Sequence, residues 1–556
     1  MANGALGIIT EKDVDVVVRD GTRLRATVFR PEAEGAFPGI LLRTPYRKPE
    51  GGFERYVRAG YAVVTQDSRG RYASEGEWVP FTEENTGDAE DGYYSVESLA
   101  AQPWCNGRVG TLGASYNAWM QWMLAKLRPP HLAAMCAYTI PVELTEVDWP
   151  GAFKPGRRIK WWLTTMAPDL RRRAGMPPPH TPEEAREMWD NGIEGEGHWT
   201  GFLPWKRFAD YLPPGLAEYA RAWLDDPGRR PWKLDRVHAD VTVPNLDFSG
   251  WYDHCNGSIR HLGLMQQNGG SPEARRGTRL VIGPWNHPGL GKRETGGVDF
   301  GPQAAVDLPG QIIAFFDHWL KAADNGAEGV PPVRYFCMGS NRWRAAPTWP
   351  PPGAEPVELH LGPARALTES PPAQAGSDAY DYDPQNPVST LWGKEWFSGP
   401  ADRAKLAHRD DILVYRSPPL AEDMEIAGDP FAVLYAASSA PDTDFFARLV
   451  DEDGEGRALE VCYGMVRARH RNGLDADEPL VPGEACEFRV QLGPTACRFK
   501  AGHRIRLEIT SSDFPNHDRN HNTGGDDLAE TELRAARQTV HFSAARPSRL
   551  VLPRTA

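Results

Sequence analysis

The residue best suited to chemistry is Ser115, in the stretch VGTLGASYNAW at residues 109–119. A glycine-punctuated strand pattern precedes this serine and a helical pattern follows it, which predicts a sharp strand-to-helix turn. Such a turn, the nucleophile elbow, presents a reactive serine in many hydrolases. The expected Gly-x-Ser-x-Gly pattern is broken by Asn117, and a serine that only caps a helix would occupy the same position. Ser115 is therefore a candidate nucleophile that needs a base and an acid.

An acid and a base follow Ser115 in the chain order Ser, acid, His that hydrolases of this topology use. Asp253 closes the strand pattern VPNLDFSGWYD, and His287 follows the next strand pattern, TRLVIGPWNH. Both are predicted at the carboxyl ends of parallel strands, where open α/β sheets place their sites. His254 also lies there, but its place next to Asp253 in sequence suits an orienting contact poorly. We therefore predict a triad of Ser115, Asp253 and His287, with His254 as a candidate substrate contact.

Hydrogen-bond donors for an oxyanion are the next requirement of acyl transfer. The backbone N–H of Tyr116, directly after the serine, is the standard first donor. The second is expected from the loop after the third strand, where LLRTPYRK offers the hydroxyl of Tyr46. A tyrosine in such a loop is more often a packing residue, so both interpretations of Tyr46 stay open here.

The elements that must position these residues divide the chain into three regions. Strand and helix patterns alternate up to residue 145 and again over 241–348, which predicts one α/β domain with a mainly parallel sheet. Residues 146–240 are rich in Trp, Arg and Pro and look helical, so we interpret them as an inserted cap. Short alternating segments over 349–556 predict an all-β domain, a sandwich or jelly roll.

Two further groups of residues have competing interpretations. Trp161 and Trp162 in the cap are candidates for a substrate wall or for the cap core. The stretch SSDFPNHDRN, at 511–520, mimics a metal cluster, but we interpret it as a structural turn and expect no metal. No cofactor is expected either.

Composition limits the functional class. The 556 residues carry a net charge of −13 and no block of Lys or Arg, which argues against a nucleic-acid or anionic-membrane partner. Neither a signal peptide nor a membrane span is visible, and the 7 scattered cysteines contain no CxxC pair, as is typical of reduced thiols. We therefore expect a cytoplasmic protein with a small-molecule substrate. The sequence leaves the oligomeric state open, and a homodimer is compatible with it.

Several motifs together resemble one family. RTPYRK, GYAVVTQDSRGRYASEGEW, GASYNAW, GWYD, LVIGPWNH, FFDHWLK and GHRIRLEITSSDFPNHDRNHNTG, in this order, are similar to the cocaine esterase / X-prolyl dipeptidyl aminopeptidase family of serine hydrolases. The resemblance implies an α/β-hydrolase domain with a helical cap and a C-terminal jelly roll. It also implies a triad of Ser115, Asp253 and His287, with the Tyr46 hydroxyl and the Tyr116 amide as oxyanion donors.

This sequence departs from the family pattern Gly-x-Ser-Tyr-x-Gly at one point. The last glycine is replaced by Ala118, and Asn117 occupies the ordinary elbow position. Ala118 is the smallest replacement, and we expect Asn117 to point outward on the first helical turn. The departure is predicted to affect packing and to leave the chemistry intact.

The expected function is hydrolysis of acyl esters through a covalent acyl-enzyme. Members of the family also include amide-directed enzymes, namely X-Pro dipeptidyl-peptidases and β-lactam or glutaryl acylases, and these remain the alternative. An X-Pro peptidase must hold a free α-amino group and so needs carboxylates near its site. An inactive binding protein is the third interpretation, which an intact triad disfavours.

Overall fold

Ten strands form the sheet of the N-terminal half. The computed structural model describes residues 7–81, 87–148, 152–192, 198–225, 234–391 and 399–555. The strands are β1 (Gly7–Val17), β2 (Arg23–Glu32), β3 (Phe37–Thr44), β4 (Ala62–Asp67), β5 (Cys105–Ala114), β6 (Leu132–Tyr138), β7 (Leu246–Gly250), β8 (Arg279–Gly283), β11 (Val333–Cys337) and β12 (Arg342–Ala346). Their spatial order is β1-β2-β4-β3-β5-β6 followed by β7-β8-β11-β12, and the strands from β4 to β11 run parallel. The β11–β12 hairpin is an addition that the sequence patterns did not predict.

One asparagine joins the two segments of the sheet, which are separated in sequence by the cap. The Asn245 side chain accepts from the Ala137 N–H at 2.8 Å and donates to the Ala137 carbonyl at 2.9 Å. The Met135 N–H donates to the Pro244 carbonyl at 2.9 Å. These bonds set β7 beside β6, so the chain leaves the sheet into the cap and returns next to where it left.

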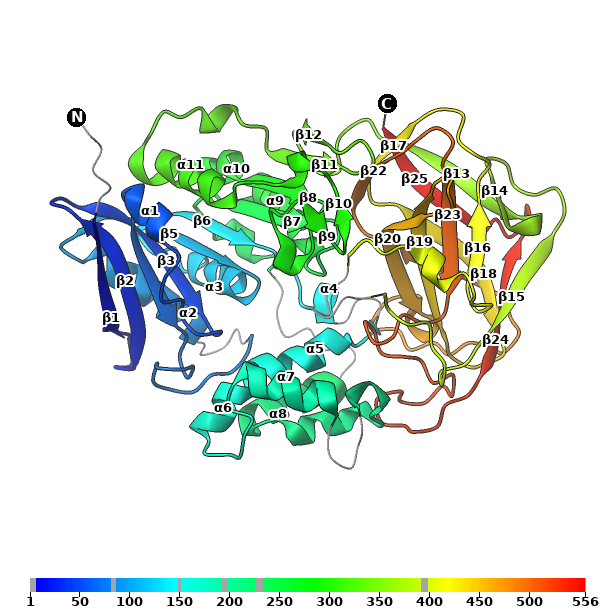
Figure 1. The fold of residues 1–556 in the computed structure, drawn as a ribbon, viewed down its shortest axis with the longest axis horizontal. Helices are drawn as coiled ribbons and strands as arrows, with labels where there is room; N and C mark the ends of the chain where they lie inside the picture. Colours follow the sequence, from blue (N-terminus) through cyan, green and yellow to red (C-terminus); the bar gives the residue numbers. More distant parts are fainter. Residues whose placement is uncertain are drawn as a thin grey trace.

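Helices cover both faces of this sheet (Figure 1). On one face, α2 (Gly87–Ala100) and α3 (Tyr116–Ala125) share a core with the inward residues of β5 and β6. On the other face, α1 (Glu54–Arg58) and α11 (Leu308–Lys321) pack in a second core. Alternation along the strands explains the division, because Val109 of β5 belongs to the first core and Leu112 to the second. Helices α9 (Ile259–Asn268) and α10 (Pro272–Gly277) complete the domain.

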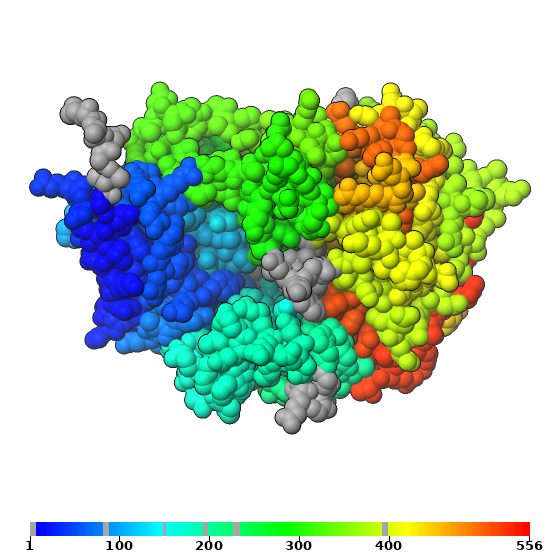
Figure 2. Space-filling view, in the orientation of Figure 1, coloured from blue at the N-terminus to red at the C-terminus, as the bar shows by residue number. Residues whose placement is uncertain are grey.

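The cap is helical, with an aromatic core. Its elements include α4 (Thr145–Asp148), α5 (Gly156–Trp161), a π-helical turn η2 (Trp162–Met166), α6 (Ala167–Arg173), α7 (Pro182–Asn191), two 3₁₀ turns η3 (Trp199–Gly201) and η4 (Trp205–Tyr211), and α8 (Pro214–Asp225). Trp162 packs edge-on against Trp223, with ring centroids 4.8 Å apart. Figure 2 shows the turquoise cap along one edge of the molecule, against blue N-terminal residues at one end and orange-red C-terminal residues at the other.

The C-terminal region is an all-β domain, as predicted. Its strands are β13 (Glu355–Gly362), β14 (Ala366–Thr368), β15 (Gly376–Tyr382), β16 (Leu413–Arg416), β17 (Met424–Gly428), β18 (Phe431–Ser438), β19 (Asp444–Glu452), β20 (Ala458–Arg467), β21 (Cys486–Gln491), β22 (Thr495–Phe499), β23 (Arg504–Thr510), β24 (Ala536–Phe542) and β25 (Arg549–Thr555). The hairpin β9 (Glu294–Thr295) and β10 (Val298–Asp299) precedes it, in the loop after β8. The pairing is almost entirely antiparallel, and the inward residues form one large apolar core.

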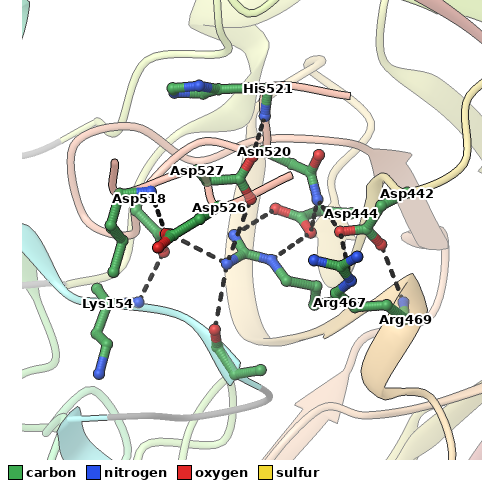
Figure 3. A network of polar contacts seen from close by, with 12 residues as sticks. Lys154, Asp442, Asp444, Arg467, Arg469, Asp518, Asn520, His521, Asp526 and Asp527 are labelled. Atoms are coloured by element: carbon green, nitrogen blue, oxygen red, sulfur yellow. Dashed lines mark hydrogen bonds and ion pairs between the residues drawn. The ribbon is translucent and has the colours of Figure 1, made fainter. Parts of the chain in front are cut away.

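Buried charges join the cap to this β domain, in what we call the cap–β junction (Figure 3). Arg467 at the end of β20 contacts Asp444 at 3.0 Å, Asp518 at 3.1 Å and Asp527 at 3.6 Å. It also donates to the Ala152 carbonyl of the cap at 3.3 Å. Burial disfavours its charge, but the three carboxylates outweigh that effect and raise the pKa of Arg467 well above its usual value. Opposite charges therefore hold the start of the cap against the β domain.

The Lys154 N–H of the cap reinforces this junction by donating to Asp518 at 2.7 Å. The Lys154 side chain turns the other way, donating to the Trp223 carbonyl inside the cap.

Among the described residues, no helix combines the length and the apolar character that a membrane crossing requires.

Candidate active site

Ser115 occupies a strained turn between β5 and α3. Its φ of 58° and ψ of −126° are unusual for a residue with a side chain. Its N–H donates to the Tyr138 carbonyl of β6 at 3.0 Å, and its carbonyl accepts from the N–H groups of Ala118 and Trp119. The backbone is thus held from both sides, while the hydroxyl makes no capping hydrogen bond to the helix. Strain of this kind is typical of a nucleophile elbow and gives no support to the helix-cap interpretation.

Gly113 and Asn117 explain how the elbow fits without its second glycine. A Cβ at Gly113, whose φ is +154°, would lie 2.5 Å from the Cβ of Asn117. The glycine two residues before the serine is therefore required because Asn117 packs over it. The prediction that Asn117 points outward is wrong, since its side chain turns back toward Gly113 and lines the cavity above Ser115. Ala118 is fully buried, as a small residue facing the sheet must be.

Close approach of two loops brings Asp253 and His287 together. Asp253 follows β7 and His287 follows β8. The Tyr252 N–H donates to the Trp285 carbonyl at 3.0 Å, and a Cβ at Gly250 would come within 2.1 Å of the same carbonyl. Glycine at position 250 therefore lets the two loops lie against each other.

The resulting pair has the geometry of an orienting acid and a base. His287 Nδ1 lies 2.9 Å and 3.1 Å from the two carboxylate oxygens of Asp253. Asp253 as a whole residue is 2% exposed, and its side chain also accepts from the Cys255 N–H at 2.8 Å. A carboxylate held in this way keeps the proton on Nδ1 and leaves Nε2 of His287 as the basic nitrogen.

His254 lies beside this pair. Its ring centroid is 4.5 Å from that of His287, and its Nδ1 is 3.7 Å from Asp253. Burial, with the nearby charges of Arg157, His287 and Arg158, lowers the pKa of His254 well below its usual value. His254 is therefore a neutral side chain, and it lines the cavity with His287.

Tyr46 and Tyr116, the two predicted oxyanion donors, both lie near Ser115. Tyr46 follows β3, and its ring lies edge-on to Tyr116 and to Trp161, with centroids 6.5 Å and 6.3 Å away. Burial raises the pKa of Tyr46 to about 12, against the opposing effects of the Arg158 charge and of hydrogen bonds with Trp161 and Ser115. Tyr46 is thus a neutral hydrogen-bond donor near neutral pH.

The Tyr116 side chain has a structural role separate from its backbone amide. Its ring is fully buried, and its hydroxyl donates to Asp88 at 3.0 Å and accepts from the Phe81 N–H at 3.0 Å. Phe81 in turn lines the cavity. Tyr116 therefore connects the elbow to an aromatic part of the cavity wall.

A cavity of about 850 Å³ opens over Ser115, between the strand ends and the cap. Its lining includes Tyr46, Ser115, His254 and His287 from the sheet side, and Trp161 from the cap. A space of this size is suited to a small organic molecule.

The two cap tryptophans have different places. Trp161 lines the cavity, whereas Trp162 is 1% exposed and is not among the lining residues. Trp162 packs against Trp223 and Tyr219. It is therefore a residue of the cap core, and the prediction that it contacts substrate is wrong. The physical reason is helical geometry, because consecutive side chains point about 100° apart.

One group of side chains in the described part of the chain has ligand types suited to a metal ion. The ligand atoms of Asp253, His254, Cys255 and His287 lie within 4.8 Å of one another. Asp253 and His287 are already bonded to each other, so a cation here would compete with the proton on His287 Nδ1. The metal-like stretch of the sequence behaves differently, because Asp513 pairs with Arg448 at 3.0 Å and Asp518 with Arg467.

Sequence reasoning missed four cationic residues on the cavity wall. Arg157, Arg158 and Lys160 belong to α5 and Arg186 to α7, and all four line the cavity. The signal was the basic run in GRRIKWW, directly before the tryptophan that faces the cavity.

The fold and this site define an α/β-hydrolase with a helical cap, of the kind that carries a serine nucleophile. Comparison with known families agrees with this class. Residues 20–289 match the family model of X-Pro dipeptidyl-peptidase (S15 family), and residues 325–551 match the X-Pro dipeptidyl-peptidase C-terminal non-catalytic domain. The chain belongs to this family, which includes cocaine esterase, and it is a serine hydrolase.

Known relatives cover almost the whole chain. Cocaine esterase of Rhodococcus sp. (strain MB1 Bresler) is 33% identical over 97% of this chain and 98% of its own length. A solved α-amino acid ester hydrolase is similar with a TM-score of 0.84 and 24% identity, over 100% of this chain and 98% of that one. A solved aminopeptidase from a marine sediment archaeon, Thaumarchaeota archaeon, has a TM-score of 0.81 and 24% identity, over 99% and 96% of the two chains. At 24% identity, the last two comparisons show similarity of the fold alone.

Proposed function

We propose that the protein is a carboxylesterase that cleaves acyl esters with Ser115 as nucleophile, His287 as general base and Asp253 as the orienting acid. The observation that carries the proposal is that Ser115, His287 and Tyr46 line one cavity while Asp253 holds His287 by Nδ1. A serine hydroxyl becomes an effective nucleophile only when such a base removes its proton.

The steps follow from this arrangement. Ser115 Oγ attacks the acyl carbonyl and His287 Nε2 takes its proton, while the Asp253 carboxylate stabilises the imidazolium. The Tyr46 hydroxyl and the Tyr116 N–H donate to the developing oxyanion. His287 then protonates the leaving alcohol, and a water molecule deprotonated by the same imidazole hydrolyses the acyl-enzyme.

The charge of the cavity wall favours esters over the peptidase alternative. An X-Pro peptidase must hold a protonated α-amino group, for which carboxylates are the natural partners. Among the described lining residues there are four cationic side chains and neither Asp nor Glu. An incoming ammonium would therefore meet like charge, whereas a neutral ester carbonyl would not.

A substrate screen tests the proposal. Short acyl esters, the matching amides and X-Pro anilides are offered to the wild type and to the Ser115→Ala variant. The proposal is supported if kcat/KM for the esters exceeds that for the amides and the X-Pro anilides, and if ester hydrolysis disappears in the variant. A preference for X-Pro anilides contradicts it. Labelling by a fluorophosphonate at Ser115 distinguishes an enzyme from an inactive binding protein, which would not react.

A further inference from the structure

The cap side of the cavity carries a concentration of positive charge that ester hydrolysis does not require. Arg157, Arg158 and Lys160 lie on α5, and Arg186 lies on α7. Helix α5 is on the side of the cap that faces the sheet (Figure 1). The α5 wall, as we call these four residues, is thus opposite the strand ends that carry Ser115 and His287.

Arg158 is the member of the α5 wall most closely associated with the site. Its guanidinium lies 4.6 Å from the centroid of the Trp161 ring and 5.6 Å from that of Phe81, and both rings line the cavity. Its charge also lowers the pKa of Tyr46 against the larger effect of burial. Contact with an aromatic ring restrains the orientation of the planar guanidinium and of its donors.

The other three members have partners that hold them in place. Arg157 donates to the Val147 carbonyl at 2.5 Å. Lys160 lies 3.9 Å from Asp190, and Arg186 donates to Glu183 at 2.7 Å on the half-exposed rim. Cationic side chains therefore line the cavity from its rim to the neighbourhood of Tyr46, and Asp190 and Glu183 offset part of the charge at the rim.

A cavity lined by one sign of charge, with apolar walls that keep the dielectric constant low, attracts ligands of the opposite sign. A carboxylate suits this wall in a specific way, since a guanidinium binds it through two parallel hydrogen bonds. His254 also lines the cavity beside His287, and because burial holds its pKa well below the usual value, this imidazole adds no charge near neutral pH.

We infer that the preferred substrates are esters that carry a carboxylate, which the α5 wall binds with Arg158 as its principal contact. The inference rests on the proposed esterase function and names the substrate class of the same site. The carboxylate can belong to the acyl group or to the alcohol, and the experiment distinguishes these two sources.

The test uses esters that differ only in charge. On the acyl side, the para-nitrophenyl monoester of adipic acid is compared with an ester in which an isopropyl group replaces the carboxylate and with one that carries a trimethylammonium group. On the alcohol side, the butyrate ester of para-hydroxybenzoate is compared with that of its methyl ester. We expect kcat/KM for the carboxylate ester of at least one pair to exceed that of its neutral partner by about tenfold or more, the size of one charge-assisted hydrogen bond.

Variants locate the effect. Arg158→Gln should reduce the ratio of kcat/KM for carboxylate over neutral ester by about tenfold, and Arg158→Lys should reduce it less. If the substitution also affects Tyr46 or folding, kcat/KM changes by the same factor for both esters, and this change cancels in the ratio. Arg186→Gln, on the half-exposed rim, provides a second variant if Arg158→Gln does not fold, and it should lower the same ratio.

Arg221→Gln is the matched control. Arg221 is an exposed residue of α8, paired with Asp210, and does not line the cavity. Its removal changes the net charge of the cap equally and should leave the ratio unchanged. Added salt should lower the ratio in the wild type because it screens the wall.

The outcomes separate the two proposals. Equal rates for the carboxylate, neutral and trimethylammonium esters, or a loss of the ratio in Arg221→Gln as large as in Arg158→Gln, overturn the inference while ester hydrolysis stands. Failure to hydrolyse any ester, together with no fluorophosphonate labelling, overturns the esterase function itself.

Discussion

The site at the strand ends and the cap–β junction are held together by different forces. Backbone hydrogen bonds and glycines position Ser115, Asp253 and His287, as the contact of Tyr252 with the Trp285 carbonyl and the close approach at Gly250 illustrate. In the cap–β junction, Arg467 and three carboxylates are buried together, each no more than 8% exposed. We therefore expect side chains of the first region to be replaceable with little loss of stability, and those of the second to contribute stability without taking part in the chemistry.

The largest expected effect tests the first half of this comparison. Ser115→Ala, Asp253→Asn and His287→Ala should each lower kcat/KM for a para-nitrophenyl ester by a factor on the order of 10³ or more. Tm should change little for Ser115→Ala, because the hydroxyl makes no capping bond. Steady-state kinetics and thermal melts on the same preparations provide the measurement, and near-full turnover by His287→Ala would falsify the assignment.

The second prediction tests the junction. Arg467→Leu leaves Asp444, Asp518 and Asp527 buried without their cation, and breaking a buried pair in this way typically costs about 3–5 kcal/mol. We expect that loss in the free energy of unfolding by urea, with kcat of the folded fraction unchanged. Arg221→Leu, which removes an exposed arginine, is the control and should cost far less. Similar losses in the two variants would contradict the proposed role of the junction.

Tyr46→Phe distinguishes a reacting hydroxyl from a packing ring. The change removes only the oxygen, so folding should survive while kcat falls by roughly 10²–10³. KM should change little if the hydrogen bond forms mainly in the transition state. A drop in Tm with kcat preserved would assign Tyr46 to packing instead.

A pH dependence is expected from His521, whose backbone N–H donates to Asp527 of the junction at 2.8 Å. Burial, with a contribution from Arg519, lowers the pKa of His521 from 6.5 to about 4. As the pH falls below 6.5 the histidine of the unfolded chain takes up a proton, whereas that of the folded protein does not until about pH 4. The free energy of unfolding therefore decreases as the pH falls from 6.5 to about 4, and the full contribution of His521 is present above pH 6.5. From about pH 7 to about pH 5.5 the loss from this one histidine should be about 1 kcal/mol.

The difference between the wild type and His521→Gln isolates this contribution. Urea unfolding of both proteins at the two pH values should show a shallower decline in the variant. Parallel declines would mean that His521 does not titrate differently in the folded and unfolded states.

The smallest effect concerns Asn117. Asn117→Gly should lower stability by at most about 1 kcal/mol, because glycine is the less favourable residue in a helical turn. Since Asn117 only packs over Gly113 and lines the cavity, kcat/KM for short esters should stay within a few-fold. A strong change in acyl-chain preference without a change in Tm would mean that the asparagine contacts the acyl group.

Much of the fold and of the candidate site was predictable because the relevant signals are local in sequence. Strand and helix patterns identified the α/β domain, the cap and the C-terminal β domain. Ser115, Asp253 and His287 each follow a strand within four residues, so their place at the carboxyl ends could be inferred from the strand patterns alone. The position of Tyr46 after β3 could be inferred in the same way, whereas its role stays a prediction.

Tertiary structure decided the features that depend on direction or on distant partners. The orientation of α5 and of the turn η2 that continues it sets Trp161 toward the cavity and Trp162 into the cap core, and packing over Gly113 turns Asn117 inward. The bond from Lys154 to Asp518 joins residues 364 positions apart, a pairing that no local pattern contains. The sequence by itself thus determined which residues follow which strands, since this depends on neighbours along the chain. The charge of the cavity wall and the cap–β junction arise only when distant segments pack together.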